Sequence, residues 1–161
     1  MSLSFSEKDY IESAIEKYSG SLVRAAYNII GNRSEAEDVA QEVFIKLYLK
    51  KPVFRNDEHE KAWLLRVAIN LAKNRIRQMK RICLLDDTEA YTEAVGEDQQ
   101  MVAKAVRELD EKYRIVIHLH YYEGYTLREI AQILNLPLST VGTRLERAKN
   151  KLREKLQSEV I

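Results

Sequence analysis

Helix-breaking residues are scarce in this chain. Its 161 residues include five Gly and two Pro, two residue types that together ordinarily make up about 12% of a protein. So few breakers predict a mostly helical chain. Hydrophobic residues account for 45% of the sequence, too large a share for a disordered protein, so the chain is expected to fold.

Cysteine and long apolar runs are also missing. The single Cys83 cannot form an internal disulfide, and no Cys or His stands at zinc-ligand spacing from it. No apolar run approaches the ~18 residues of a membrane span, and the N-terminus lacks the basic start and apolar stretch of a signal peptide. We therefore expect no metal or redox framework, no membrane insertion and a cytoplasmic location.

An excess of charge of one sign is missing too, because the formal net charge is only +1. This near-neutrality argues against the basic footprint of a nucleic-acid binder. The charges are segregated, however: residues 66–82 hold six basic and no acidic residues, 83–100 hold six acidic and no basic ones, and 144–155 hold six basic against two acidic. Runs of charge are often only solvated faces. Whether these runs contact nucleic acid therefore depends on their placement on the predicted helices.

Apolar spacing and capping patterns predict helices throughout the first half. One helix is expected from about Glu7 and another over 18–30, ended by Gly31. Ser34 opens a capping box for a helix over 34–49, and Asp57–Glu60 opens a second box for a long helix that also carries the basic run. The apolar stripe predicted for that long helix comprises Leu64, Val67, Ala68, Leu71, Ala72, Ile76 and Met79.

The second half predicts a helix-turn-helix. Helices are expected from about 99 and over 112–122, ended by Gly124. Thr126 then opens a capping box for a short helix, and Ser139 caps a helix to about 156. A short helix, a tight turn and a second helix form the DNA-binding pattern, although an ordinary helical hairpin with a soluble basic face is the plain alternative. If the apolar side of the last helix is buried, the outer side presents Thr140, Thr143, Arg144, Arg147 and Lys151.

No enzyme motif is present. The sequence has no Gly-rich phosphate loop, no GxSxG and no HExxH. His118 and His120 are two residues apart and face different sides of a helix, so they cannot chelate one metal. The acidic cluster in 35–42 suits a helix N-terminus without any catalytic role. We expect no cofactor, no metal and no catalytic residue.

Three segments together carry a specific resemblance: Ala-Glu-Asp-Val-Ala-Gln-Glu-Val-Phe at 36–44, Trp-Leu-Leu-Arg-Val-Ala-Ile-Asn at 63–70, and Thr-Val-Gly-Thr-Arg-Leu-Glu-Arg-Ala at 140–148. In this order and spacing they resemble the extracytoplasmic-function (ECF) sigma factors, small sigma-70-type bacterial transcription initiation factors. The resemblance implies a non-catalytic subunit that directs core RNA polymerase to promoters and aids their melting.

The resemblance also implies the domain organisation. It predicts an all-α chain with a sigma region 2 bundle over 1–82, a flexible acidic linker over 83–98, and a sigma region 4 helix-turn-helix over 99–161. The acidic run falls at this boundary. Two rival interpretations remain open: a stand-alone helix-turn-helix regulator that binds DNA without polymerase, and a polymerase- or RNA-binding adaptor whose basic stripes contact RNA.

The first segment is implied to dock on the clamp helices of the largest polymerase subunit, with the polymerase flap as a further contact. Helical spacing agrees, because the implied residues share one outward side. An acidic solvated face would explain the charges but not an outward Ile45. The implied polymerase-binding residues are Asp38, Gln41, Glu42 and Ile45.

The loop 52–56 and the long helix are implied to melt the minus-10 element and capture an extruded base. Aromatic stacking offsets the unstacking cost, and the amide of Asn70 can both donate to and accept from a base edge. The alternatives are that Trp63 only anchors the core and that Asn70 is an ordinary polar residue in mid-helix. Many relatives carry an acidic residue where Asn74 stands. The implied minus-10 residues are Phe54, Trp63, Arg66, Asn70, Lys73, Asn74, Arg75 and Arg77.

The last helix is implied to read the minus-35 element in the major groove. Relatives usually carry a basic residue where Gly142 stands, so one contact is missing here. The resemblance further implies an anti-sigma factor as a regulatory partner. The implied minus-35 residues are Ser139, Thr140, Thr143, Arg144, Arg147 and Lys151.

Overall fold

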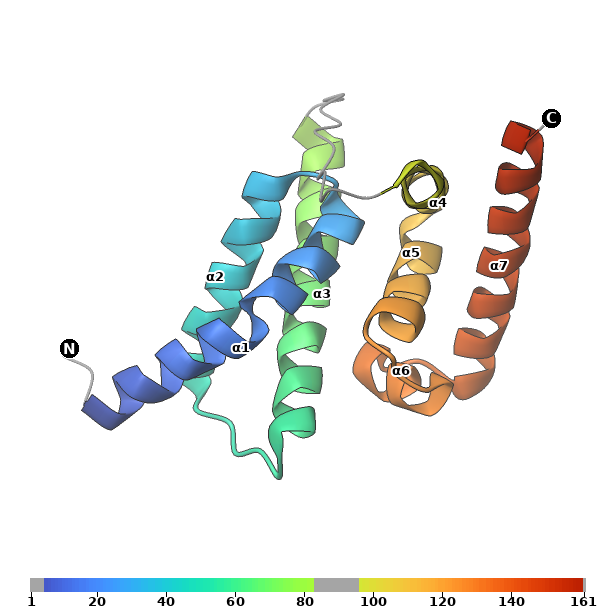
Figure 1. The fold of residues 1–161 in the computed structure, drawn as a ribbon. Coiled ribbons are helices and arrows are strands. Elements are labelled where there is room, and N and C mark those ends of the chain that lie inside the picture. Colours follow the sequence, from blue (N-terminus) through green and yellow to red (C-terminus); the bar gives the residue numbers. More distant parts are fainter. Residues whose placement is uncertain (1–4, 83–95, 161) are drawn as a thin grey trace. The chain divides into compact units, whose positions relative to one another are not determined.

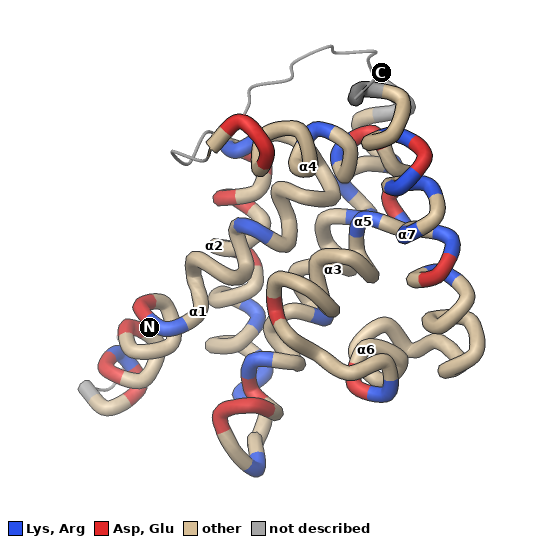
Figure 2. The backbone as a smooth tube through the Cα atoms, turned by 45° about the vertical axis from the view of Figure 1, so that its right-hand side comes forward, with Lys and Arg blue, Asp and Glu red and all other residues tan. Residues whose placement is uncertain are grey.

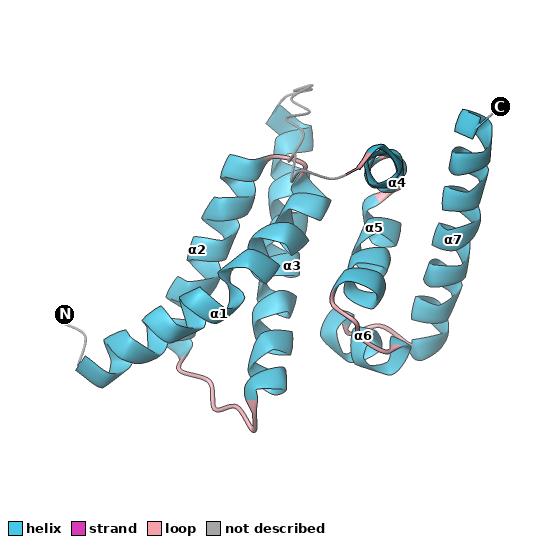
Figure 3. Cartoon of the chain, viewed as in Figure 1, coloured by secondary structure: helices cyan, strands magenta, loops and turns pink. Residues whose placement is uncertain are grey.

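The computed structural model describes residues 5–82 and 96–160. The chain divides into two compact units, Met1–Asp87 and Thr88–Ile161. Both are built from helices, and the described residues contain no β-strand (Figures 1 and 3). The all-α, two-domain prediction is therefore confirmed. Among the described helices, none is both long and apolar enough to cross a membrane.

The described part of the first unit is a bundle of three helices (Figure 1). Helix α1 (Phe5–Ile30) packs against both α2 (Arg33–Lys50) and α3 (Asp57–Ile82). The prediction of two helices before Gly31 is wrong, because the chain runs as one continuous helix through Gly20. Gly31 does end it, with a φ of 75° that favours glycine.

The predicted caps of α2 and α3 are also wrong, and both for the same reason. Asn32 caps α2 by accepting from the backbone N–H of Glu35 at 3.0 Å. Asn56 caps α3 by accepting from the backbone N–H of His59 at 2.8 Å. In each case an asparagine just before the predicted box takes the cap position, where Asn is among the strongest N-caps.

The core of the bundle lies on the inner face of α3. This face is turned slightly from the predicted stripe: Leu65 and Ile69 are buried, whereas Val67, Leu71 and Met79 are only half-buried. The buried residues of α3 are Leu64, Leu65, Ala68, Ile69, Ala72 and Ile76, together with Glu60.

Buried Glu60 ties the start of α3 to α1. The Tyr10 hydroxyl donates a short hydrogen bond to the Glu60 carboxylate, and the Tyr18 hydroxyl donates to the backbone carbonyl of Asp57 at 3.4 Å. Burial, followed by the nearby carboxylates of Glu60 and Asp57, raises the pKa of Tyr18 to about 12. A phenol is protonated at neutral pH, so both hydroxyls donate to the first turn of α3 and tie it to α1.

The second unit packs short helices against one long helix. Helices α4 (Glu97–Arg107) and α5 (Glu111–Ile117) both contact α7 (Leu138–Val160). The predicted helix over 112–122 is α-helical only as far as Ile117. It continues as a π-helical turn, η1 (His118–Tyr122), in which the backbone N–H of Glu123 reaches the carbonyl of His118 at 3.1 Å.

The helix-turn-helix forms as predicted. Thr126 and Glu129 make both hydrogen bonds of a capping box at the start of α6 (Leu127–Leu134). Gly124 ends the preceding segment with a φ of 76°. One detail differs: Ser139 lies inside the first turn of α7 and does not cap it, because the carbonyl of Pro137 accepts the first backbone bonds, from Thr140 and Val141.

The predicted linker covers residues 83–98, and residues 83–95 of it lie outside the described residues. At its other end Glu97 and Asp98 already belong to the first turn of α4. This turn begins slightly earlier than the sequence predicts, and the helix dipole favours carboxylates there.

Candidate functional site

The first candidate surface is the outer face of α2. Asp38 and Gln41 are exposed there and Glu42 is partly exposed. Ile45 follows at 56% exposure and Leu49 at 70%. These residues recur at the three- and four-residue spacing of one helix face. The sequence analysis missed Leu49, although extending the same spacing by one turn identifies it.

Arg75 of α3 neutralises part of this face. One guanidinium nitrogen lies 2.5 Å from a Glu35 carboxylate oxygen and the other 2.9 Å from one of Glu42, with Asp38 at 3.9 Å. Partial burial acts to lower the pKa of Arg75, but the bonds to Glu35 and Glu42 outweigh it and leave that pKa raised. Three carboxylates share one cation, so the face keeps an excess of negative charge.

The second candidate surface is the outer face of α3. Arg66, Asn70, Asn74 and Arg77 are exposed along it, and Lys73 is half-buried between them. Arg75 is not part of this face. It follows Arg66 by about 2.5 helical turns and so points to the opposite side. The prediction that Arg75 faces DNA beside Arg66 and Arg77 is thus corrected by its ion pairs with α2. The side chains of Lys80 and Arg81 lie outside the described residues.

An aromatic cluster stands where the α2–α3 loop meets α3. The Phe54 ring lies 5.7 Å from the Trp63 ring, centroid to centroid, in a tilted arrangement. It also lies 5.4 Å from the His59 ring, edge to face. Both predicted base-capture aromatics are therefore together and half-buried. His59 was not singled out from the sequence, although it precedes Trp63 by one helical turn.

The third candidate surface is the N-terminal part of α7, whose basic positions are blue in Figure 2. Val141, Leu145 and Ala148 are buried. The opposite side presents Thr143, Arg147 and Lys151 as exposed residues, with Thr140 and Arg144 half-buried and Ser139 exposed in the first turn. A β-carbon built at Gly142 meets nothing within 4 Å, so a side chain fits there. The Lys151 ammonium stands 5.8 Å from the centre of the Tyr113 ring, a cation–π contact.

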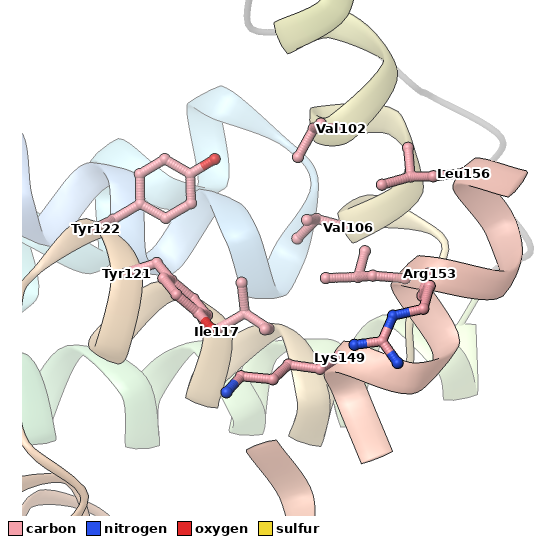
Figure 4. Close-up of a pocket in the computed structure, with 9 residues that line it drawn as sticks. Val102, Val106, Ile117, Tyr121, Tyr122, Lys149, Arg153 and Leu156 are labelled. Atoms are coloured by element: carbon pink, nitrogen blue, oxygen red, sulfur yellow. The ribbon is translucent and has the colours of Figure 1, made fainter. Parts of the chain in front are cut away.

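A pocket of about 660 Å³ lies within the second unit (Figure 4). Its walls are mostly apolar and come from α4, α5, η1 and α7, and its rim carries two cations of α7. The lining residues are Val102, Val106, Ile117, Tyr121, Tyr122, Lys149, Leu152, Arg153 and Leu156.

The histidines do not form a metal site. His118 is buried and lies 3.4 Å from a Glu123 carboxylate oxygen. His120 bonds through Nδ1 to the carbonyl of Tyr125 at 2.9 Å, on another side of the segment. Within residues 5–82 and 96–160, no group of three or more His, Cys, Asp or Glu residues is arranged to hold a metal ion.

Two family models match the chain. Sigma-70 region 2 matches residues 14–82, and Sigma-70, region 4 matches residues 99–152. The ECF RNA polymerase sigma factor SigW of Bacillus subtilis is 34% identical over an alignment that covers 94% of this chain and 91% of SigW. The ECF RNA polymerase sigma-E factor of Escherichia coli K12 is 32% identical, over 76% of this chain and 74% of its own length.

Solved structures share the fold. The sigma factor RpoE of Bartonella quintana, in complex with the anti-sigma factor NepR, superposes with a TM-score of 0.77 at 23% identity and covers 93% of this chain and 98% of its own. CnrH, in complex with the cytosolic domain of CnrY, has a TM-score of 0.69 at 24% identity and covers 94% and 90%.

Replacing Arg75 tests its structural role. We expect Arg75→Met to lower the free energy of unfolding of the first unit by about 1–2 kcal/mol, because charged hydrogen bonds are lost but the carboxylates are partly hydrated. Urea unfolding followed by circular dichroism measures this. Arg77→Met removes the same charge from the outer face and should cost less than about 0.5 kcal/mol; equal losses for the two variants would contradict the assignment.

Proposed function

Because the chain belongs to the ECF RNA polymerase sigma factors of the sigma-70 family, we propose that its three surfaces divide the work of promoter recognition. The protein is a non-catalytic initiation factor that directs core RNA polymerase to promoters. In this proposal α2 binds polymerase, α3 and the α2–α3 loop open the minus-10 element, and α7 reads the minus-35 element. The first unit is thus region 2 and the second region 4, as residues 1–82 and 99–161.

The observation that carries the polymerase assignment is the composition of the outer face of α2. Asp38, Gln41 and Glu42 offer acidic and polar contacts, and Ile45 and Leu49 expose apolar side chains beside them. An acidic solvated face would have no reason to expose two large aliphatic residues in line. Apolar anchors beside charged residues suit a protein partner that carries basic residues. We assign this face to the clamp helices of the largest polymerase subunit.

The minus-10 proposal rests on the outer face of α3 and the aromatic cluster. Arg66, Lys73 and Arg77 place cations where phosphates can approach, and Asn70 and Asn74 lie between them without adding negative charge. Asn70 stands on the same face as Trp63, so a base stacked near Phe54 and Trp63 comes within reach of its amide. Arg75 supports α2 and is left out of the DNA contacts.

The minus-35 proposal rests on the exposed side of α7. Thr140, Thr143, Arg144 and Arg147 occupy the first turns, from which a recognition helix reads the major groove. Ser139 and Lys151 flank this set and are assigned to phosphates. Arg suits both guanine and phosphate.

The pocket of region 4 is proposed as the second polymerase contact. Its apolar walls with Lys149 and Arg153 at the rim fit an amphipathic helix that carries acidic residues. We assign it to the polymerase flap. An anti-sigma factor, the kind of partner that NepR is for RpoE, is the proposed regulator, and the proposed place of action is the bacterial cytoplasm.

Transcription in vitro tests the whole proposal. Core polymerase with and without the protein is given a library of genomic fragments, and the transcripts are sequenced. We expect promoter-specific transcripts only when the protein is present. Tight binding to DNA fragments without polymerase, and no new transcripts with it, would instead support the stand-alone regulator; polymerase binding without new starts would support the adaptor.

Replacing Ile45 tests the polymerase-binding face. Ile45→Asp is expected to weaken binding to core polymerase about tenfold or more, because a charge replaces an apolar anchor in the interface. Ile15→Asp makes the same substitution at an exposed isoleucine of α1 and should leave the affinity unchanged. The dissociation constant from fluorescence anisotropy of the labelled protein measures both.

The same measurement tests the pocket. Val102→Asp is expected to weaken binding to core polymerase, and Gln99→Asp, at an exposed residue of the same helix, is its control.

Gly142 offers a gain of function. Gly142→Lys is expected to strengthen holoenzyme binding to minus-35 DNA and to steepen the slope of log affinity against log salt by about 0.9, the effect of one more phosphate contact. Gly142→Ala should raise the free energy of unfolding by about 1 kcal/mol through helix propensity alone. It should leave the slope of log affinity against log salt unchanged. Equal salt slopes in the two variants would place Gly142 away from the DNA backbone.

A further inference from the structure

His59 contacts the α2–α3 loop at two points. Its Nδ1 accepts a hydrogen bond from the backbone N–H of Arg55 at 3.2 Å. Its ring lies against that of Phe54 at 5.4 Å, edge to face. One side chain of α3 therefore contacts the loop through its backbone and through the neighbouring aromatic ring.

The loop spans a short stretch between two fixed ends. Lys51, at its start, forms an ion pair with Glu7 of α1 at 2.7 Å. Asn56, at its end, caps α3. Between these ends Val53 is 92% exposed, and the hydrogen bond from Arg55 to His59 fixes the loop next to the cap at Asn56.

His59 also belongs to the outer face of α3. It precedes Trp63 by four residues and Arg66 by seven, so it begins the stripe that continues to Asn70 and Arg77. A ring whose Nδ1 accepts from an amide has an unprotonated Nδ1 and, as the neutral imidazole, carries its proton on Nε2. The N–H on Nε2 is then a polar donor at the end of this face.

We propose that His59 is a positioning residue of the base-capture site: it fixes the loop at Arg55 and the ring of Phe54, so that Phe54 and Trp63 are in place before the base is extruded. This inference rests on the proposed role of the loop in minus-10 opening. Holding a loop in its bound conformation removes the cost of ordering it during binding. His59 thus contributes to opening without having to touch the base.

Two conservative variants separate the contributions of the side chain. In His59→Asn the amide oxygen takes the place of Nδ1 and keeps an acceptor for Arg55. In His59→Phe the ring is kept and the acceptor is lost. His59→Ala removes both and keeps the backbone N–H of residue 59 that donates to the Asn56 side chain, so the cap of α3 stays in place.

The test uses a promoter found by the transcription assay, in duplex form and with single abasic sites scanned through the non-template strand of the minus-10 element. The abasic position that most weakens open complexes of the wild-type holoenzyme marks the captured base. Open-complex formation is measured by permanganate reactivity for each variant on the intact and the abasic promoter.

On the intact promoter His59→Ala should lower the equilibrium constant for opening about three- to tenfold, the size expected for one hydrogen bond and one aromatic contact. On the abasic promoter it should match the wild type, because no base remains to be captured. His59→Asn and His59→Phe should each recover part of the loss, and the affinity of all variants for core polymerase should be unchanged.

An equal loss on both promoters, or no loss on the intact one, overturns the inference. Phe54→Ala and Trp63→Ala, measured in parallel, separate it from the proposed function. Suppose the abasic site no longer weakens opening by Phe54→Ala and Trp63→Ala but weakens opening by His59→Ala as much as by the wild type. In that case only the role of His59 fails. If the abasic site weakens opening by both aromatic variants as strongly as it weakens opening by the wild type, the base-capture assignment of the loop itself fails.

Discussion

The burial of one face of α3 against α1 and α2 determines where the functional groups of the first unit lie. Six apolar side chains of α3 fill the core, and the helix has only one opposite side left for solvent. That side receives Arg66, Asn70, Asn74 and Arg77. Burial of an apolar face is worth about 25 cal/mol for each Å² removed from water, far more than the surface charges contribute. Packing, and not charge, therefore selects which residues of α3 remain on the side that is proposed to meet DNA.

The same packing explains the ion pairs of Arg75. A cation on the flank of α3 that turns toward α2 meets three carboxylates on its neighbour. The proposed polymerase-binding face of α2 and the proposed DNA-binding helix α3 are thereby joined by ion pairs as well as by the core. Rigid support of this kind suits a subunit whose two partners must be bound at a fixed spacing.

Much of the fold could be predicted from the sequence, because its signals are local. The capping box at Thr126, the ends at Gly31 and Gly124 and the buried side of α7 depend on residues within a few positions of each other. The errors at Ser34 and Asp57 arise because two asparagines compete for the same caps. The π-helical turn at His118 has no sequence signature that spacing alone detects.

The site was predictable to the extent that it follows helical spacing. Leu49 extends the α2 face by one turn, and the angle between Arg66 and Arg75 already separates these two residues. The sequence analysis grouped the basic residues by charge alone and therefore placed Arg66 and Arg75 on the same face of the helix. The contact between His59 and Arg55 could not be predicted, because it depends on the path of an irregular loop.

Helix α7 contributes to two different surfaces of region 4. Its first turns carry Thr143 and Arg147, and its later turns carry Leu152, Arg153 and Leu156 on another side, in the wall of the pocket. Because the helix is continuous, the residues between these sets fix both their separation, about 1.5 Å per residue, and the angle between them, about 100° per residue. One residue inserted near Asn150 would turn Leu152, Arg153 and Leu156 by about 100° about the helix axis relative to Thr143 and Arg147. The number of residues in this segment thus fixes the angle between the two proposed surfaces, even at positions whose side chains belong to neither.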